Sequence, residues 1–474
     1  MDTRVLIAGA GPTGLTLAIE LARRDVAVRI IDKADTYFVG SRGDGLQPRT
    51  LEVFEDLGVL DAVLAAGAAP VPMKIHVGGE VVGERMMVDP VEPTPAKPYP
   101  TGWFLGQSQT EGILRDRLAE FGVHVELATA LTGFEQDEDG VTATLSTGET
   151  VRAEYLVGAD GGKSFVRKTL GIAFEGTTDE SVRMLLGDVH AEGLDRGFGH
   201  WFASPDDPMR GMMFSPLPGT PWFQFGSPLG DGDLEVETAL PAIQARLDAL
   251  TGGGITLSDL AWSTVWRPNV RLAARFRDGR VFLAGDSAHV HPPTGGQGLN
   301  TGVQDGYNLG WKLADGAPEL LDSYEAERRA NAARVLGIST ELMRKYADGD
   351  DDAHKRGEET QQLDISYRGG PLSPAGTGAL RPGDRAPDSP LADANGKRVR
   401  LFELFAGPHA TRLVFGDGEL GENGYRILPA GSVATGTDLV DEGGHAYAAY
   451  DVKPGAEVLV RPDGYVWSVS RGLS

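Results

Sequence analysis

Residues 5–23 are VLIAGAGPTGLTLAIELAR, and this stretch decides the fold of the first part of the chain. The apolar run Val5–Ala8 predicts a buried strand, because such runs are typical of parallel sheets that helices cover on both faces. Gly14–Arg23 predicts a helix, and Ala27–Ile31 predicts a second strand. A strand, a glycine-rich turn, a helix and a second strand begin a Rossmann-like α/β fold.

The glycine-rich turn predicts a dinucleotide site. Gly9 permits the tight turn, Gly11 lets a pyrophosphate approach the backbone, and Gly14 lets the helix pack on the strand. Asp32 ends the second strand, where an acid can bind a ribose hydroxyl. Glycine-rich turns also occur without nucleotides, so this alternative stays open. The candidate contacts in this region are Gly9, Gly11, Thr13, Gly14, Asp32 and Lys33.

A second glycine-rich stretch, GDSAHVHPPTGGQGLN at residues 285–300, narrows the choice of nucleotide. Asp286 follows the apolar strand Val281–Ala284, which places its carboxylate at the carboxyl end of the sheet, where ligands bind in such folds. There it can bond the ribityl hydroxyls of a flavin, although an aspartate that caps the next segment is the alternative. The stretch therefore predicts FAD as the cofactor.

The loop after Asp286 suits a flat ring. The prolines fix the backbone, and the glycines remove side chains beside the ring. A helix predicted at Asn300–Ala314 would aim its N-terminal N–H groups at the ring edge that is anionic in reduced flavin. The candidate flavin-facing residues are Pro293, Gly295 and Gly296, and the candidate cofactor contacts are Gly285, Asp286, Pro293, Gly298, Leu299 and Asn300.

Three further side chains have two interpretations each. Arg42 could neutralise the cofactor diphosphate or be a solvated surface arginine. His289 and His291 could suggest a metal, but the chain has no cysteine and no third ligand at suitable spacing. We therefore expect structural histidines near the flavin and no metal site.

Composition limits the classes of partner. The 474 residues include 68 acidic and 44 basic side chains, for a net charge of −24, whereas nucleic acids and anionic membranes require basic surfaces. The absence of cysteine excludes disulfides and thiolate catalysis. No signal peptide or membrane-spanning run is evident, so we expect a cytoplasmic protein with no nucleic-acid or membrane partner.

The pattern along the chain predicts an interrupted domain. Lys74–Val88 alternates around a GGE turn and predicts a β-hairpin, and Val182–Phe225 predicts further antiparallel strands. Helices are predicted at Pro48–Ala66 and Leu234–Leu250. We expect an FAD-binding domain at 1–70, 102–176 and 274–379, an antiparallel-sheet substrate domain at 71–101 and 177–273, and a third domain at 380–474.

The antiparallel segment is rich in large apolar side chains that could face a substrate: His200, Trp201, Phe202, Met212, Phe214, Trp222, Phe223 and Phe225. Alternation assigns about half of them to the core of the sheet. Arg210 could pair with a substrate phenolate or carboxylate, or could lie on the surface. The candidate substrate contacts are Arg210, Met212, Phe214 and Phe225.

The order of GAGPTG, GADGGKSFVRK (residues 158–168) and GDSAHVHPP resembles that of the class A FAD-dependent aromatic hydroxylases, which have the para-hydroxybenzoate hydroxylase fold. The resemblance covers the whole chain and is strongest to the branch with a thioredoxin-like C-terminal domain. It implies that Asp160, Gly161 and Arg167 serve both FAD and a pyridine nucleotide, and that Gln107 and Leu131 contact FAD.

The resemblance also implies a reaction. FAD would be noncovalent, NADPH or NADH would bind transiently, and O2 would be captured as a C4a-hydroperoxyflavin that hydroxylates a phenolic or polycyclic aromatic substrate. No side-chain base is required, so no catalytic residue is named. A Baeyer–Villiger-type oxygenase, an oxidase and a non-catalytic flavoprotein that sequesters an aromatic ligand are the alternatives. Without cysteine, the third domain would give structural support or contacts within a homodimer, and a monomer is equally compatible.

Overall fold

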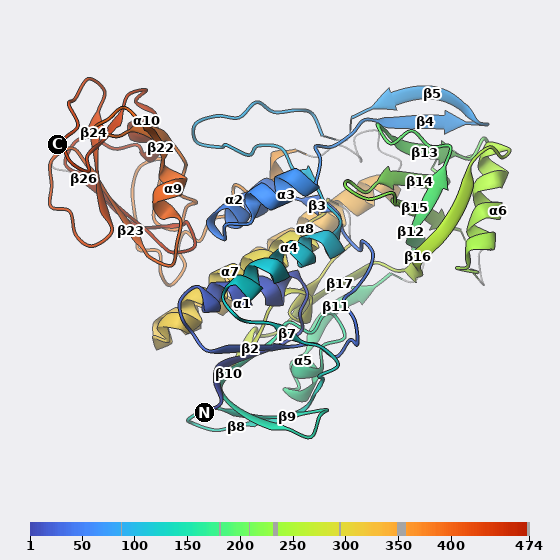
Figure 1. Ribbon diagram of the computed structural model, residues 1–474, viewed down its shortest axis with the longest axis horizontal. Coiled ribbons are helices and arrows are strands. Elements are labelled where there is room, and N and C mark those ends of the chain that lie inside the picture. The colour runs from blue at the N-terminus through green and yellow to red at the C-terminus, as the bar shows by residue number, and fades with distance from the viewer. Residues whose placement is uncertain are drawn as a thin grey trace.

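The computed structural model describes most of the chain: residues 1–86, 88–179, 182–207, 209–230, 236–292, 295–347 and 357–471. In Figure 1 the sheet that contains β2 and β10 lies at the bottom, a second sheet covered by α6 lies at the right, and the C-terminal sheet lies at the left. The predicted mixed α/β class is confirmed. Among the described residues, no helix is both long enough and apolar enough to cross a membrane.

The first sheet forms the base of the molecule. Its described strands follow the order β18-β19-β10-β1-β2-β7, with the hairpin β8–β9 attached to β10. The central strands are parallel, and the side chains of Val5, Leu6 and Ile7 in β1 are fully buried. The strands are β1 (Thr3–Ala8), β2 (Val28–Ile31), β7 (Val125–Glu126), β8 (Leu131–Gln136), β9 (Val141–Leu145), β10 (Thr150–Gly158), β18 (Arg277–Asp278) and β19 (Val281–Leu283).

Helix α1 (Pro12–Ala22) packs between α4 (Gln107–Glu120) and α7 (Gly298–Asp315), as Figure 1 shows. The contact with α7 is a seam of glycines one helical turn apart. A Cβ atom at Gly302 would overlap Thr13, one at Gly306 would lie 2.6 Å from the Thr13 carbonyl oxygen, and one at Gly310 would overlap Glu20. The two backbones therefore touch at Gly306, and a side chain at any of the three positions would force α1 or its side chains to shift.

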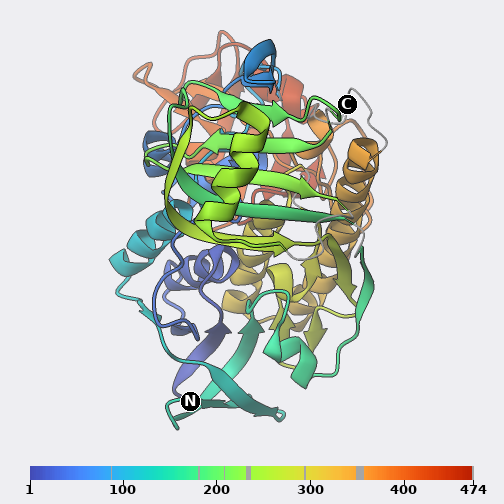
Figure 2. The same ribbon diagram turned by 90° about the vertical axis from the view of Figure 1, so that its right-hand side faces the viewer.

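The second sheet is antiparallel apart from one pair and has the described strand order β16-β12-β15-β14-β13-β4-β5. Helix α6 (Leu240–Thr251) lies across one of its faces, as Figure 2 shows. Its start differs from the predicted helix, because Pro241 is tolerated only in a first helical turn. The strands are β4 (Met73–Val77), β5 (Glu80–Arg85), β12 (Arg183–Glu192), β13 (Gly199–Ala203), β14 (Gly211–Pro216), β15 (Phe223–Leu229) and β16 (Thr256–Trp266).

Smaller elements connect the two sheets. The predicted helix Pro48–Ala66 is wrong as a single helix, because Gly58 adopts a φ of 74° and separates α2 (Pro48–Asp56) from α3 (Leu60–Ala66). The long helix α8 (Pro318–Ala347) was not predicted. The remaining elements are β3 (Gly45–Leu46), β6 (Trp103–Phe104), α5 (Phe165–Thr169), β11 (Phe174–Thr178), β17 (Asn269–Ala273), β20 (His289–Val290) and two 3₁₀ turns, Gly285–Ser287 and Glu358–Thr360.

The C-terminal sheet has its own core and the described strand order β22-β21-β25-β24-β23-β26-β27. Its likeness to thioredoxin and the three domain boundaries stay predictions. The elements are β21 (Pro390–Ala392), β22 (Arg398–Arg400), α9 (Leu401–Phe405), β23 (Thr411–Phe415), β24 (Gly424–Pro429), β25 (Leu439–Asp441), α10 (His445–Tyr450), β26 (Ala456–Val460) and β27 (Val466–Ser470).

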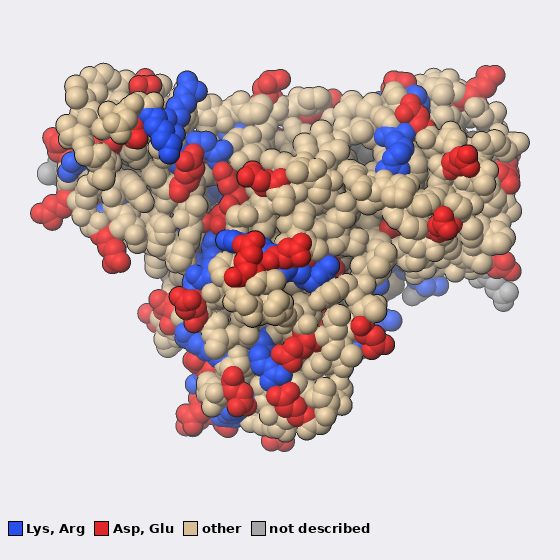
Figure 3. Space-filling view, viewed as in Figure 1, with Lys and Arg blue, Asp and Glu red and all other residues tan. Residues whose placement is uncertain are grey.

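Buried charges join this C-terminal unit to the helices of the first sheet. Arg461 Nη1 donates to Glu327 Oε1 at 2.7 Å, and Lys312 Nζ lies 2.7 Å from Glu327 Oε2. All three side chains are fully buried. On the surface, by contrast, acidic and basic side chains are interspersed over the face shown in Figure 3. The interface is therefore specified by paired charges that solvent does not reach.

Candidate functional site

The three glycine-rich motifs meet at the carboxyl ends of β1, β10 and β19. A Cβ at Gly9 would overlap the carbonyl oxygen of Ala159, and a Cβ at Gly285 would overlap the side chain of Thr13. The hydroxyl of Ser287 donates to the carbonyl oxygen of Gly158 at 2.5 Å. Segments far apart in the sequence thus share one site, with backbone against backbone.

In the first motif, Asp32 is held by the turn itself. Its Oδ2 accepts from the N–H of Ala10 at 2.9 Å, and its Oδ1 accepts from the N–H of Ala34 at 2.9 Å. A Cβ at Gly14 would overlap the carbonyl oxygen of Gly9, whereas a Cβ at Gly11 would meet no atom within 4 Å. Gly14 is therefore required for packing, and Gly11 borders open space.

In the second motif, Asp160 caps α5. Its Oδ2 accepts from the N–H groups of Phe165 and Val166, at 2.6 Å and 3.1 Å. Its Oδ1 is buried and has no hydrogen-bond partner among the described residues. The neighbouring Gly161 has a φ of 79°, which favours glycine. One carboxylate oxygen is thus left for a ligand.

Arg167 ties the second motif to the third. Its guanidinium donates to the carbonyl oxygens of Ser287 at 2.7 Å and Gly162 at 2.9 Å, and it lies 3.7 Å from the centre of the Phe174 ring. The side chain is buried. Arg167 therefore has a structural role, and its predicted contact with nucleotides stays a prediction.

In the third motif, Asp286 lies in the 3₁₀ turn Gly285–Ser287. Its carboxylate is exposed to solvent, yet desolvation by the surrounding protein raises its pKa, and the charges of His289 and Arg42 oppose that shift. The charge of Arg42 thus acts on Asp286, although the two residues are far apart in the sequence.

His289 belongs to a buried network around Asp305. The Asp305 carboxylate accepts from the N–H of Gly285 at 2.9 Å and from Arg328 Nε at 2.6 Å, and it lies 2.6 Å from His289 Nε2. Burial alone would raise the pKa of Asp305, but the charge of Arg328 holds it below its usual value. His291 is also desolvated, which lowers its pKa to about 4. Within the described ranges, no group of three potential ligands could hold a metal ion.

The loop before α7 is shaped by left-handed glycines and by Asn300. Gly295 and Gly296 have φ values of 87° and 61°. The Asn300 side chain is buried, donates to the carbonyl oxygens of Gly45 and Gly296 at 2.8 Å and 2.6 Å, and accepts from the N–H of Gln47 at 2.7 Å. Only its backbone is therefore left for a cofactor. Pro293 lies outside the described residues.

The remaining predicted contacts surround the first motif. Gln107 Nε2 donates to Glu111 Oε1 at 2.8 Å, and the Arg42 guanidinium lies 4.6 Å from the centre of the Phe38 ring. Lys33 is exposed beside Asp32. Leu131 begins β8, and Leu299 packs on the core of the first sheet. The structure brings these residues to one region, and their contacts with a cofactor stay predictions.

The geometry fits a long dinucleotide cofactor. Gly11 leaves open space beside the N-terminus of α1, Asp160 presents a buried oxygen without a partner, and Asp286 presents a solvent-facing carboxylate. The N-termini of α1 and α7 supply backbone N–H groups that have no partner inside their helices. These are the donors and acceptors that a diphosphate, a ribityl chain and a flavin ring require.

The predicted substrate contacts require a correction. Met212, Phe214 and Phe225 are fully buried in the cluster that packs the second sheet against Ile243 and Leu247 of α6. These three residues form the core of that sheet, so the prediction that they face a substrate is wrong. Arg210 has an exposed side chain paired with Asp207 at a turn, which favours the surface alternative.

The opposite face of the second sheet, which we call the inner face, faces the cofactor region. Of its side chains, Trp201 is among those that the sequence analysis offered for a substrate, whereas the other residues of this face were not named there. Trp262 on this face lies against Gly40 and makes an edge contact with Phe38, at 6.0 Å between ring centres. Cross-strand register places these half-buried or small residues together on it: Met184, Leu186, Trp201, Met213, Gly226 and Thr264.

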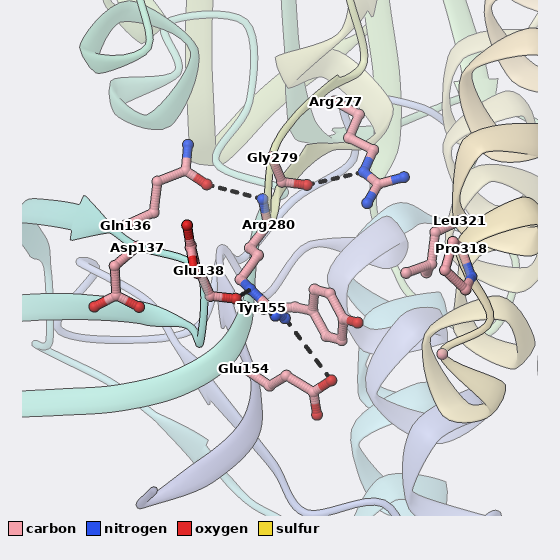
Figure 4. Close-up of a pocket in the computed structure, with 11 residues that line it drawn as sticks. Gln136, Asp137, Glu138, Glu154, Tyr155, Arg277, Gly279, Arg280, Pro318 and Leu321 are labelled. Carbon is pink, nitrogen blue, oxygen red and sulfur yellow. Dashed lines mark hydrogen bonds and ion pairs between the residues drawn. The ribbon is translucent and has the colours of Figure 1, made fainter.

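Two recesses lie near these elements. One of about 510 Å³ opens between the end of α3 and the loop after β14, and Ser215 of the inner face lines it. The other, of about 730 Å³, lies beside the start of β19 (Figure 4). There Arg280 bonds the carbonyl oxygen of Glu138 at 2.9 Å, and Arg277 bonds that of Gly279 at 2.8 Å. The arginines that line the second recess bond to nearby backbone carbonyl groups, and the three glycine-rich motifs do not line it. We therefore assign this recess no role.

Comparison with known proteins agrees with this geometry. Residues 2–339 match the FAD binding domain family. The chain is 45% identical to a flavin-dependent monooxygenase of Mycobacteroides abscessus, over 98% of this chain and 96% of that protein. It is 34% identical to 6-methylpretetramide 4-monooxygenase of Streptomyces rimosus, over 98% and 90% of the two chains.

A solved structure supports the same assignment. The ternary complex of aklavinone-11 hydroxylase with FAD and aklavinone matches with a TM-score of 0.82 and 28% identity, over 100% of this chain and 96% of that one. The predicted resemblance and the predicted cofactor, FAD, are confirmed. The chain belongs to the FAD binding domain family and, within it, to the flavin-dependent monooxygenases.

Proposed function

We propose that this enzyme uses NADPH or NADH and O2 to hydroxylate a phenolic or polycyclic aromatic compound. The observation that carries the proposal is the inner face, an apolar surface with methionine and tryptophan side chains turned toward the cofactor region. Methionine adapts to flat, irregular ligands, and aromatic side chains stack on them. The relatives named for 6-methylpretetramide and aklavinone support a substrate of this kind.

The chain's own residues would hold the cofactor and shield the reaction. Asp32 and the turn at Gly11 would hold the adenosine diphosphate part, Asp286 would bond the ribityl chain, and the first turn of α7 would face the ring. When bound, FAD supplies the redox chemistry: it takes electrons from NAD(P)H and transfers one oxygen atom from O2. The protein excludes water and orients the aromatic ring, so no side-chain base is required.

The test is a screen of phenols, quinones and aromatic polyketides for compounds that accelerate NADPH or NADH oxidation. We expect a product heavier by one oxygen atom on the ring. Insertion of oxygen beside a carbonyl would instead identify a Baeyer–Villiger oxygenase, and a dehydrogenated product an oxidase. Tight binding without NAD(P)H consumption would identify a sequestering protein. The same purification, followed by sedimentation, distinguishes a monomer from a homodimer.

Gly226 is expected to control the size of the substrate. A Cβ there would lie 3.3 Å from Leu186 Cδ2 and 3.7 Å from the terminal methyl groups of Met184 and Met213, all flexible ends that can move. Gly226→Leu should therefore fold, fill the inner face and raise KM for a polycyclic substrate by about tenfold or more. Gly83→Ala is the control: Gly83 lies in the same sheet, and a Cβ there would meet no atom within 4 Å. An unchanged KM in Gly226→Leu would place the substrate elsewhere.

Asp286→Ala should weaken FAD binding. A carboxylate that accepts hydrogen bonds from the ribityl hydroxyls contributes roughly ten- to a hundredfold in affinity. Titration of the apoprotein with FAD, followed by flavin fluorescence, gives the dissociation constant. Asp322→Ala, an exposed acid on α8, should leave it unchanged. Full FAD affinity in Asp286→Ala would show that this carboxylate has no part in binding.

A further inference from the structure

Ser41 lies in the loop between β2 and β3, and both of its backbone groups are bonded by side chains of the second sheet. Its N–H donates to Asp188 Oδ2 at 2.5 Å, and its carbonyl oxygen accepts from Gln224 Nε2 at 2.7 Å. Asp188 in β12 and Gln224 in β15 are cross-strand partners. Two neighbouring strands therefore present one acceptor and one donor, matched to a single residue of the cofactor-binding part of the chain.

The loop is shaped to lie on this pair. Gly40 has a φ of 135°, and a Cβ there would overlap the ring of Trp262 and lie 3.2 Å from Asp188 Oδ2. Trp262 is the partner of Asp188 on the strand at its other side. Gln224, Asp188 and Trp262 thus form a row across three strands of the inner face, and the loop rests directly on it. Any side chain at residue 40 would lift the loop off the row.

The carboxylate in this row is costly to bury. Asp188 is only 1% exposed, and desolvation raises its pKa to about 6, a shift that the bond from Ser41 opposes. A buried charge destabilises a fold unless its partners are well placed, and apolar residues of similar size would pack at no such cost. The placement of Asp188 is therefore better explained by what it holds than by the stability of its sheet.

Asp188 holds the backbone of Ser41, the residue immediately before Arg42. The Arg42 side chain is exposed, its guanidinium lies over Phe38, and its charge opposes the raised pKa of Asp286. An exposed arginine loses conformational entropy when it binds a phosphate, and a fixed backbone reduces the number of conformations that must be searched. Fixing Ser41 therefore favours binding through Arg42.

We propose that Asp188 and Gln224 are positioning residues for Arg42: by fixing both backbone groups of Ser41, they align the Arg42 guanidinium with the diphosphate of FAD. FAD affinity then depends on two side chains of the second sheet that need not touch the cofactor. This proposal concerns the cofactor site alone, so it holds whichever substrate the enzyme takes, and a failed substrate screen would leave it intact.

The test is a double-mutant cycle on FAD binding, measured on apoprotein without substrate. Arg42→Ala and Gln224→Leu should each weaken FAD binding by roughly tenfold. Because both act on the same guanidinium, the double variant should bind FAD within about twofold of Arg42→Ala. Gln244→Leu is the matched control: it removes an amide that bonds Leu257 and Ile255 in the same sheet region and should leave FAD affinity unchanged.

Hydrogen exchange gives a readout that does not depend on FAD. In Gln224→Leu the amide of Ser41 should exchange faster than in the parent protein or in Gln244→Leu. The melting temperatures of both variants are measured as well, so that faster exchange at Ser41 is not mistaken for a lower overall stability. Asp188→Leu, which keeps the approximate shape of the side chain but cannot accept the hydrogen bond from the Ser41 N–H, is used if Gln224→Leu does not fold. Additive losses in the cycle, an unaltered Ser41 exchange rate, or full FAD affinity in Arg42→Ala would each overturn the proposal.

Discussion

Gly306→Leu in α7 should yield protein that holds little FAD and unfolds at a much lower denaturant concentration. The Cβ would lie 2.6 Å from the carbonyl oxygen of Thr13 and 3.1 Å from the backbone nitrogen of Leu17. Both atoms are backbone, so no side chain can rotate away, and α1 and α7 must separate. Overpacking of this kind costs about 3 kcal/mol or more where the backbone itself blocks the way.

We expect the loss to extend to the cofactor because the N-termini of both helices border the proposed FAD site. Urea unfolding followed by circular dichroism, together with the flavin-to-protein absorbance ratio, measures both effects. Gly337→Ala in α8 is the control, because a Cβ there meets no atom within 4 Å, and this change should stabilise the helix by about 0.5–1 kcal/mol. A Gly306→Leu protein as stable as the parent would show that the backbones of α1 and α7 are not in close contact at this position.

Glu327→Ala should be the most damaging change at the C-terminal interface. Glu327 lies buried between Lys312 of α7 and Arg461 of the C-terminal unit. Burial alone would raise its pKa, but the charge of Arg461 holds it well below its usual range, so the carboxylate is ionised at neutral pH. Its removal leaves Lys312 without its ion-pair partner and Arg461 with Asp463 alone, and breaking such a buried pair typically costs about 3–5 kcal/mol.

The matched control lies on the same helix. Glu341→Ala removes an exposed acid paired with Arg344, and such a pair contributes little to stability because water and salt screen it. Calorimetric melting of both variants at neutral pH makes the comparison, and limited proteolysis between α8 and β21 reports whether the C-terminal unit has detached. Equal melting temperatures for the two variants would mean that the buried network does not hold the interface.

The sequence predicts the fold where local chemistry decides it. Gly9, Gly14 and the apolar run of β1 form a strand–turn–helix unit because steric fit requires glycine at those positions, and this unit needs no distant information. The break between α2 and α3 was missed because Gly58 interrupts a pattern that keeps its helical spacing. Helix α8 begins with a proline, has acidic and basic residues in its first and last turns and is rich in strong helix formers, so its sequence does carry a local helix signal.

The substrate side could not be predicted because both faces of the second sheet are apolar. Alternation separates Met212 and Phe214 from Met213, but it does not tell which set faces α6. The role of Asp188 depends on a bond to Ser41, far away in the chain, and no spacing rule reveals such a contact. Local patterns therefore located the cofactor motifs, while the pairing of distant segments fixed the rest of the site.

The glycine contact between α1 and α7 also determines when, during translation, α1 can pack into the fold. Thr13 and Leu17 are synthesised early, but Gly302 and Gly306, which pack against them, lie much later in the sequence. At translation rates of about 5–20 residues per second, α7 is synthesised roughly 15–60 s after α1, and α1 has no α7 to pack against during that interval. During that time the nascent N-terminal strand and helix must be shielded by chaperones or by the ribosome, so expression yield should be sensitive to translation speed between residues 23 and 298.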